Sequence, residues 1–221
     1  MKKLGFTNFL SHVIDFMVNE GVPINTIALV LMLPVIATIV ALSRQILGIK
    51  AFGIYTPTII TLAFLATGLK YGLFVFLVVL AAGTLTRIFL KRFRLLYLPR
   101  MAIVLSIVSL SIIGMLTYAA SSRRTVLISM SIFPMLILIT LVEKFVAVQI
   151  KRGLLTAITL SLETLAISVF CYYVMSWEIL RNFILIYPEI IFLSLLFNFF
   201  LGKWTGLRLF EYVRFRKVVK G

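Results

Sequence analysis

The 221-residue sequence has one cysteine, one histidine and seven acidic residues, against 22 lysines and arginines. The single cysteine, Cys171, cannot form an internal disulfide, and together with one histidine it leaves too few ligands for a zinc or iron–sulfur site. His12 lies close to the N-terminus, which argues against histidine base catalysis in the apolar part of the chain. No His-Glu-x-x-His motif, glycine-rich phosphate loop or acidic metal cluster is present. We therefore expect no cofactor and no catalytic centre.

Apolar residues make up most of the sequence. They account for 62% of it, only 13% is charged, and the mean hydropathy is +1.14. Soluble domains are nearer half apolar, so this composition is typical of an integral membrane protein, whose helices are solvated by lipid. The net charge of +15 could attract nucleic acid, but the basic residues form short clusters between long apolar runs. That distribution is typical of loops beside anionic lipid headgroups, and we expect lipid rather than nucleic acid as the partner.

Charged residues divide the chain into apolar runs of the ~17–25 residues that a spanning helix needs. The predicted fold class is therefore an all-α polytopic bundle with seven spans. These lie at 23–43, 51–69, 72–90, 101–120, 125–142, 154–175 and 183–202.

The basic residues also predict an orientation. Six lie on one side of the seven-span arrangement: Lys2, Lys3, Lys70, Arg123, Arg124 and Arg181. Fifteen lie on the other: Arg44, Lys50, Lys91, Arg92, Arg94, Arg100, Lys144, Lys151, Arg152, Lys203, Arg208, Arg214, Arg216, Lys217 and Lys220. The positive-inside rule places the second side in the cytoplasm, so the N-terminus is predicted outside and the C-terminus inside.

Two flanking segments are predicted to lie on the membrane surface. In residues 1–22, apolar side chains recur at helical spacing over 4–18, which predicts an amphipathic helix on the outer leaflet. The tail at 203–221 combines apolar residues with a strongly basic face, and we expect it on the anionic cytoplasmic leaflet. The spans at 23–202 form the domain between them.

Prolines inside the spans predict kinked or interrupted helices, because proline lacks the backbone donor that a helix needs. They are Pro34, Pro57, Pro134 and Pro188. Most such breaks are structural. At two of these prolines a break could instead form a binding site: Pro57, which lies beside Tyr55 and Thr56, and Pro188, which directly precedes Glu189.

Glu163 and Glu189 are the acidic residues within the predicted spans, where a carboxylate must face the bundle interior, a cavity or a partner. Arg87 lies at a depth that would allow a pair with Glu163, whereas Glu189 has no obvious cationic partner. A structural hydrogen bond and a functional role fit both carboxylates equally. The candidate intramembrane polar site comprises Glu163, Glu189, Arg87, Tyr55, Thr56 and Pro57.

The stretches FGIYTP at 52–57 and LLYLPR at 95–100 are the most specific parts of a resemblance that extends from about Gly21 to the C-terminus. The sequence resembles a bacterial family of seven transmembrane helices usually fused to an inactive transglutaminase-like domain. The resemblance implies a bacterial cytoplasmic membrane protein with that domain outside, in agreement with the orientation from charge. Here only the short amphipathic lead precedes the spans, so we expect a separate transglutaminase-like partner.

The resemblance also implies a function. Such proteins are associated with ATP-grasp, glutamate-ligase-like enzymes, and the segment around Gly53–Pro57 is distantly similar to the small membrane subunit of poly-γ-glutamate synthase. We expect a non-catalytic membrane subunit of a peptide synthesis, export or anchoring system. Candidate cytoplasmic partner or lipid contacts are Arg92, Arg94, Arg100, Lys151 and Arg152. A small-solute transporter or channel and a membrane scaffold or signalling protein are the alternatives, and a homo-oligomer is left open.

Overall fold

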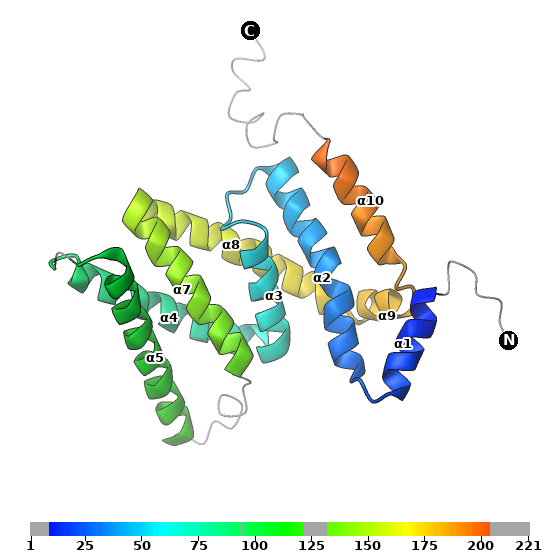
Figure 1. Ribbon diagram of the computed structural model, residues 1–221, viewed down its shortest axis with the longest axis horizontal. Coiled ribbons are helices and arrows are strands. Elements are labelled where there is room, and N and C mark those ends of the chain that lie inside the picture. The colour runs from blue at the N-terminus through cyan, green and yellow to red at the C-terminus, as the bar shows by residue number, and fades with distance from the viewer. Residues whose placement is uncertain (1–8, 94, 122–131, 204–221) are drawn as a thin grey trace, which may run out of the picture. The chain divides into compact units, whose positions relative to one another are not determined.

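The computed structural model describes residues 9–93, 95–121 and 132–203, and every regular element in these ranges is a helix (Figure 1). Long runs of leucine, isoleucine, valine and phenylalanine suit this class, because a helix pairs its backbone polar groups internally where lipid offers no partner. The all-α prediction is confirmed. The elements are α1 (Phe9–Asn19), α2 (Ile24–Leu42), the π-helical turn η2 (Ser43–Leu47), α3 (Tyr55–Thr67), α4 (Leu69–Leu90), α5 (Tyr97–Ser121), α7 (Ile132–Arg152), α8 (Leu154–Met175), α9 (Glu178–Ile186) and α10 (Ile190–Gly202).

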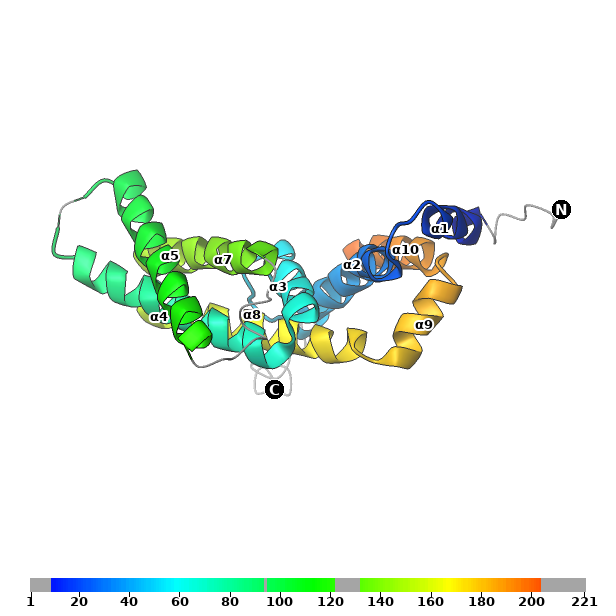
Figure 2. The same cartoon turned by 90° about the horizontal axis from the view of Figure 1, so that it is seen from below.

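Each of the seven predicted spans overlaps one of these helices or, for the last, the pair α9 and α10. Four helices in the described ranges are long and apolar enough to cross a membrane, namely Ile24–Leu47, Leu69–Leu90, Tyr97–Tyr118 and Leu154–Met175. The pair α9 and α10 would make a fifth span, with a bend of 101° between its two halves (Figure 2). With 13 residues, α3 is only about 20 Å long, shorter than the ~30 Å hydrocarbon core.

The predicted boundary after residue 142 is wrong, because α7 continues to Arg152. The prediction took Glu143 and Lys144 as the end of the span. Both side chains are exposed, while their neighbours Val142 and Phe145 are buried, so the charges occupy the outer face of a helix that continues. What was predicted as a basic loop at 144–152 is therefore helical. The start of the predicted span at 125–142 lies outside the described residues, as does the tail from residue 204.

The prolines occupy three different settings. Pro57 and Pro134 lie in the first turns of α3 and α7, where a missing N–H leaves no helical bond unmade. Pro34 lies within α2, which continues past it. Pro188 falls in the break between α9 and α10. The prediction of an interrupted helix is thus confirmed at Pro188, whereas Pro57 and Pro134 mark helix starts rather than kinks.

Single glycines connect two pairs of successive helices. Gly68 separates α3 from α4, and Gly153 separates α7 from α8. Their φ angles are 80° and 92°, in the left-handed region that glycine adopts without steric cost. A single residue with this geometry ends one helix and starts the next, so both connections are as short as they can be.

The chain divides into two compact units, each with its own packing. Unit 1 comprises residues 1–58 and 167–221, and unit 2 comprises residues 59–166. In unit 1, α2 packs against α10 and α9, and α2 and α10 lie side by side in Figure 1. In unit 2, α4 packs against α5 and α7, and α5 also contacts α7.

Candidate functional site

In unit 2 the last turns of α4 and α7 come together. Gly83 allows this approach, because a Cβ on it would lie only 2.4 Å from Val142 Cγ1. One turn further along α4, Arg87 donates a 2.9 Å hydrogen bond from Nη2 to the backbone carbonyl of Gln149 in α7. The ends of two helices that are predicted to run in the same direction therefore meet at one end of unit 2. We call this the basic end, comprising residues 87–93, 95–100 and 144–153.

Gln149 is a buried amide at the basic end. It follows Val142 and Val146 at the spacing i, i+4, i+7, and both valines lie close to Gly83, so Gln149 belongs to the stripe of α7 that faces α4. Its side chain is 0% exposed. Neither its Nε2 nor its Oε1 has a hydrogen-bond partner in the part of the chain that the structure describes. A buried amide without partners costs free energy, so this side chain is an unusual feature that needs an explanation.

Arg100 lies at the same end, in the first turn of α5. It donates a 2.9 Å hydrogen bond from Nη2 to the carbonyl of Leu95, and its buried Nε has no partner among the described residues. It is also close enough to Arg87 for the two positive charges to repel each other. The basic end therefore holds two neighbouring guanidinium groups and an amide with free hydrogen-bonding capacity.

The remaining predicted partner contacts surround this group. Arg92, Lys151 and Arg152 are exposed, and the contact between Arg87 and Gln149 gathers them at one end of unit 2. Arg94 lies outside the described residues. In the sequence no acidic residue occurs between Glu20 and Glu143, or between Glu143 and Glu163. The exposed surface of the basic end is therefore suited to binding anionic groups.

The segment around Pro57, in unit 1, is a helix start held by a neighbouring helix. Ser168 in α8 donates a 3.1 Å hydrogen bond to the carbonyl of Pro57, and Thr56 donates one of 2.7 Å to the carbonyl of Phe52. Thr56 and Pro57 are buried, whereas Tyr55 is 79% exposed and points away from the buried part of this segment. Sequence reasoning missed Ser168, because one serine in a span is explained equally well by local bonding to its own helix.

A second polar connection in unit 1 joins α10 to α2. Asn198 Nδ2 donates to Thr38 Oγ1 at 2.6 Å, and that hydroxyl donates in turn to the carbonyl of Pro34 at 2.8 Å. The hydroxyl thus links the amide of one helix to the backbone of the other beside a helix-interior proline. Asn198 was also missed, although an amide within an apolar run was a signal that could have indicated it.

Glu189 lies at the break between α9 and α10 as the residue preceding α10. Ser11 in α1 donates to Glu189 Oε1 at 3.5 Å, the long limit of a hydrogen bond. Near the start of α9, Arg181 donates a hydrogen bond to Asn25 Oδ1 in α2. The carboxylate at the break is thus in contact with the predicted interfacial helix.

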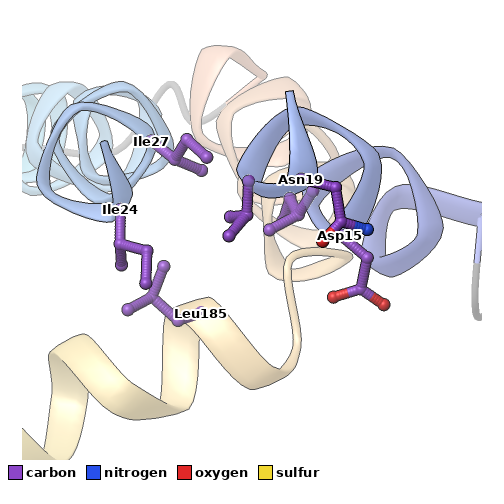
Figure 3. Close-up of a pocket in the computed structure, with 7 residues that line it drawn as sticks. Asp15, Asn19, Ile24, Ile27 and Leu185 are labelled. Carbon is purple, nitrogen blue, oxygen red and sulfur yellow. The ribbon is translucent and has the colours of Figure 1, made fainter. Parts of the chain in front are cut away.

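A cavity of about 480 Å³ lies between α1, α2 and α9. In Figure 3, Ile24 and Leu185 point toward each other across it, and Asp15 and Asn19 project from α1. Its lining is Ile14, Asp15, Val18, Asn19, Ile24, Ile27 and Leu185. The lining is apolar apart from two side chains at the edge of α1, so the cavity offers little polar chemistry.

Glu163 is half-buried in α8. The guanidinium of Arg87 bonds the carbonyl of Gln149, and its pair with Glu163 stays a prediction. In the described ranges no group of three or more histidine, cysteine, aspartate or glutamate residues could hold a metal ion. Of the predicted intramembrane residues, Tyr55, Thr56, Pro57 and Glu189 lie in unit 1, and Arg87 and Glu163 lie in unit 2.

A model of a protein family described as seven transmembrane helices usually fused to an inactive transglutaminase matches residues 7–219. Curated proteins and solved structures give no match. The family match covers both units and the basic end.

Proposed function

Because the chain belongs to the family of seven transmembrane helices usually fused to an inactive transglutaminase, we propose that it is a non-catalytic membrane subunit of a peptide synthesis and export system. Its basic end binds an acidic cytoplasmic ligase of the ATP-grasp type. Its outer side works with a transglutaminase-like domain. The peptide is polyglutamate-like and hence polyanionic, and the membrane is the bacterial cytoplasmic membrane.

The observation that carries this proposal is the gathering of Arg92, Lys151 and Arg152 at one end of unit 2. The segment after α4 and the last turn of α7, about 60 residues apart in the sequence, present their cations at one end of unit 2, on the side predicted to be cytoplasmic. Complementary charge steers an acidic protein onto such a surface and sets its orientation. The same surface would also attract a polyanionic product as it leaves the ligase.

The chemistry of the polar groups supports binding rather than catalysis. The groups that meet at the basic end are guanidinium groups and an amide. Arginine stays protonated at physiological pH and an amide does not titrate, so neither acts readily as a general acid or base. Both groups bind carboxylates and phosphates well.

Co-purification from the native membrane tests the proposal. We expect the wild-type chain to recover an ATP-grasp ligase, together with peptide product, by mass spectrometry. In the double variant Lys151→Gln/Arg152→Gln, capture of the ligase should fall several-fold and become more sensitive to salt, because exposed charges act mainly on association. Lys70→Gln, an exposed lysine at the other end of α4, is the matched control and should capture the ligase as the wild type does.

Recovery of the chain with neither a ligase nor a peptide product would count against the proposal. Equal loss of the ligase in the double variant and in Lys70→Gln would show that overall charge matters and that the basic end does not.

The break between α9 and α10 favours a second candidate, a small-solute transporter. Broken helices near a carboxylate are the usual place for a transport site, and Glu189 lies at a 101° bend. If this function holds, Glu189→Gln should reduce solute flux in proteoliposomes relative to the wild type. Unchanged flux would remove Glu189 from the mechanism.

A further inference from the structure

Three side chains from three helices lie at the basic end of unit 2, and two of them, Arg100 and Gln149, carry buried groups without a hydrogen-bond partner in the described part of the chain. Arg87 is in the last turn of α4, Arg100 in the first turn of α5 and Gln149 in the last turn of α7. The carbonyl of Gln149 holds Arg87 in place, while the side-chain amide of Gln149 and the Nε of Arg100 are buried without partners in the described part of the chain. Each of these two buried groups is a donor without an acceptor.

The charges of Arg87 and Arg100 at this end are both positive. Arg87 and Arg100 repel each other, and each donates a hydrogen bond to a backbone carbonyl, of Gln149 and of Leu95 respectively. Water screens this repulsion in part, because both arginine side chains are half-buried. One oxyanion between them would turn the repulsion into two attractions and would accept from Arg100 Nε and Gln149 Nε2. The group that suits these donors is therefore an anion with several acceptor oxygens.

The surroundings indicate where this anion comes from. On α4, Ile88 and Phe89 flank Arg87 with large exposed apolar side chains that are suited to contact with acyl chains. Lys151 and Arg152 follow Gln149 and place it at the predicted level of the cytoplasmic headgroups. An oxyanion that arrives at this depth beside apolar side chains is most simply the phosphate of a lipid.

We propose that Arg87, Arg100 and Gln149 form a binding site for the phosphate of an anionic phospholipid headgroup in the inner leaflet. The two guanidinium groups bind the phosphate oxygens, and Gln149 Nε2 donates to one of them. Gln149 Oε1 then accepts from a headgroup hydroxyl, so a hydroxyl-bearing headgroup such as that of phosphatidylglycerol fits better than phosphatidic acid. The site goes beyond the proposed function and requires no ligase.

Thermal unfolding of the purified full chain in nanodiscs tests this site. Discs of phosphatidylcholine alone are compared with discs that also contain phosphatidylglycerol or phosphatidic acid. For the wild type we expect phosphatidylglycerol to raise the unfolding temperature most and phosphatidic acid less. Lys70→Gln, at the other end of α4, should keep the full shift.

Two substitutions of Gln149 separate a ligand role from a packing role. Gln149→Leu should unfold in phosphatidylcholine at a temperature no lower than the wild type, yet bind phosphatidylglycerol about tenfold more weakly, the factor that one good hydrogen bond supplies. Gln149→Glu places a carboxylate beside both arginines. It should be stabilised in phosphatidylcholine and should lose the shift with phosphatidylglycerol.

Other results would overturn the proposal. An equal phosphatidylglycerol shift in the wild type, Gln149→Leu and Gln149→Glu would show that the lipid binds elsewhere. If Gln149→Leu does not fold, the phosphatidylglycerol shift is compared instead in Gln149→Glu and Arg100→Gln. A full shift in both would show that the lipid binds elsewhere. If millimolar inorganic phosphate in phosphatidylcholine discs reproduces the full shift, the site binds a soluble phosphate and the lipid assignment is wrong.

Discussion

The two units join their helices in different ways. In unit 1, polar side chains connect neighbouring helices, as Asn198 does through Thr38 to Pro34 and as Ser168 does to the carbonyl of Pro57. In unit 2, α4 and α7 are joined by close packing at Gly83 and by the bond from Arg87 to the carbonyl of Gln149, while the side-chain amide of Gln149 is buried without a partner within the described residues. The amide of Asn198 and the hydroxyl of Ser168 in unit 1 therefore have hydrogen-bond partners on a neighbouring helix, whereas the side-chain amide of Gln149 in unit 2 has none among the described residues.

This difference distinguishes polar side chains that stabilise the fold from polar side chains that are available to bind a ligand. A hydrogen bond between two spanning helices is complete in the folded protein and contributes roughly 1 kcal/mol to its stability. A buried donor without an acceptor costs a similar amount and persists where a ligand supplies the acceptor. The comparison therefore predicts that the polar contacts of unit 1 stabilise the protein and that the unpaired groups at the basic end of unit 2 serve the proposed lipid site.

The largest effect is expected where unit 2 is most closely packed. Gly83→Val should destabilise the protein by about 3 kcal/mol or prevent its accumulation, because its Cβ would clash with Val142. The free energy of unfolding can be measured by titration with dodecyl sulfate in mixed micelles. Gly114→Ala in α5, whose Cβ would meet nothing within 4 Å, is the control and should be neutral or slightly stabilising. Equal effects of both substitutions would contradict close packing of α4 against α7.

A smaller loss is expected in unit 1. Asn198→Leu removes the donor to Thr38 Oγ1 and should lower the free energy of unfolding by about 1 kcal/mol, the usual size of a hydrogen bond between spanning helices. Thr159→Val is the control, because Thr159 is exposed and bonds only the carbonyl of Leu155 in its own helix. If the two variants unfold alike, the polar connection between α10 and α2 does not stabilise unit 1.

The smallest effect is expected at the basic end, and with the opposite sign. Gln149→Leu in phosphatidylcholine should leave stability unchanged or raise it by up to about 1 kcal/mol, because it removes a buried amide that lacks partners. The same replacement of an amide by leucine is thus expected to destabilise unit 1 and not unit 2. A loss in Gln149→Leu as large as in Asn198→Leu would remove the distinction between the two units.

The sequence was sufficient to predict the helices wherever an apolar run ended at clear signals. The predicted span at 154–175 has the same bounds as α8, because Gly153 and the turn after Met175 enclose it. The break at Pro188 was also predicted, since proline cannot continue the backbone ladder. The end of α7 was missed because Glu143 and Lys144 interrupt the apolar run, although they lie on the exposed face of a continuing helix.

The site was harder to predict, because hydropathy gives the depth of a residue and not the helix that it faces. Depth alone suggested Glu163 as a partner of Arg87, a pair that stays a prediction, and it did not indicate the carbonyl of Gln149 that the guanidinium bonds. Every residue has a backbone carbonyl, so the sequence does not show which of them accepts a hydrogen bond from a side chain. Gln149 was not singled out, because it fell in the predicted basic loop at 144–152, where an amide is ordinary, whereas the structure buries it without side-chain partners among the described residues.

Both proposals depend on the basic end facing the cytoplasm, and labelling with a membrane-impermeant maleimide tests this most directly. The native Cys171 is buried and should give little background. In intact cells, Lys70→Cys should be labelled from outside, while Lys151→Cys should react only after the membrane is permeabilised. Labelling of Lys151→Cys in intact cells, with protection of Lys70→Cys, would invert the orientation and contradict the account.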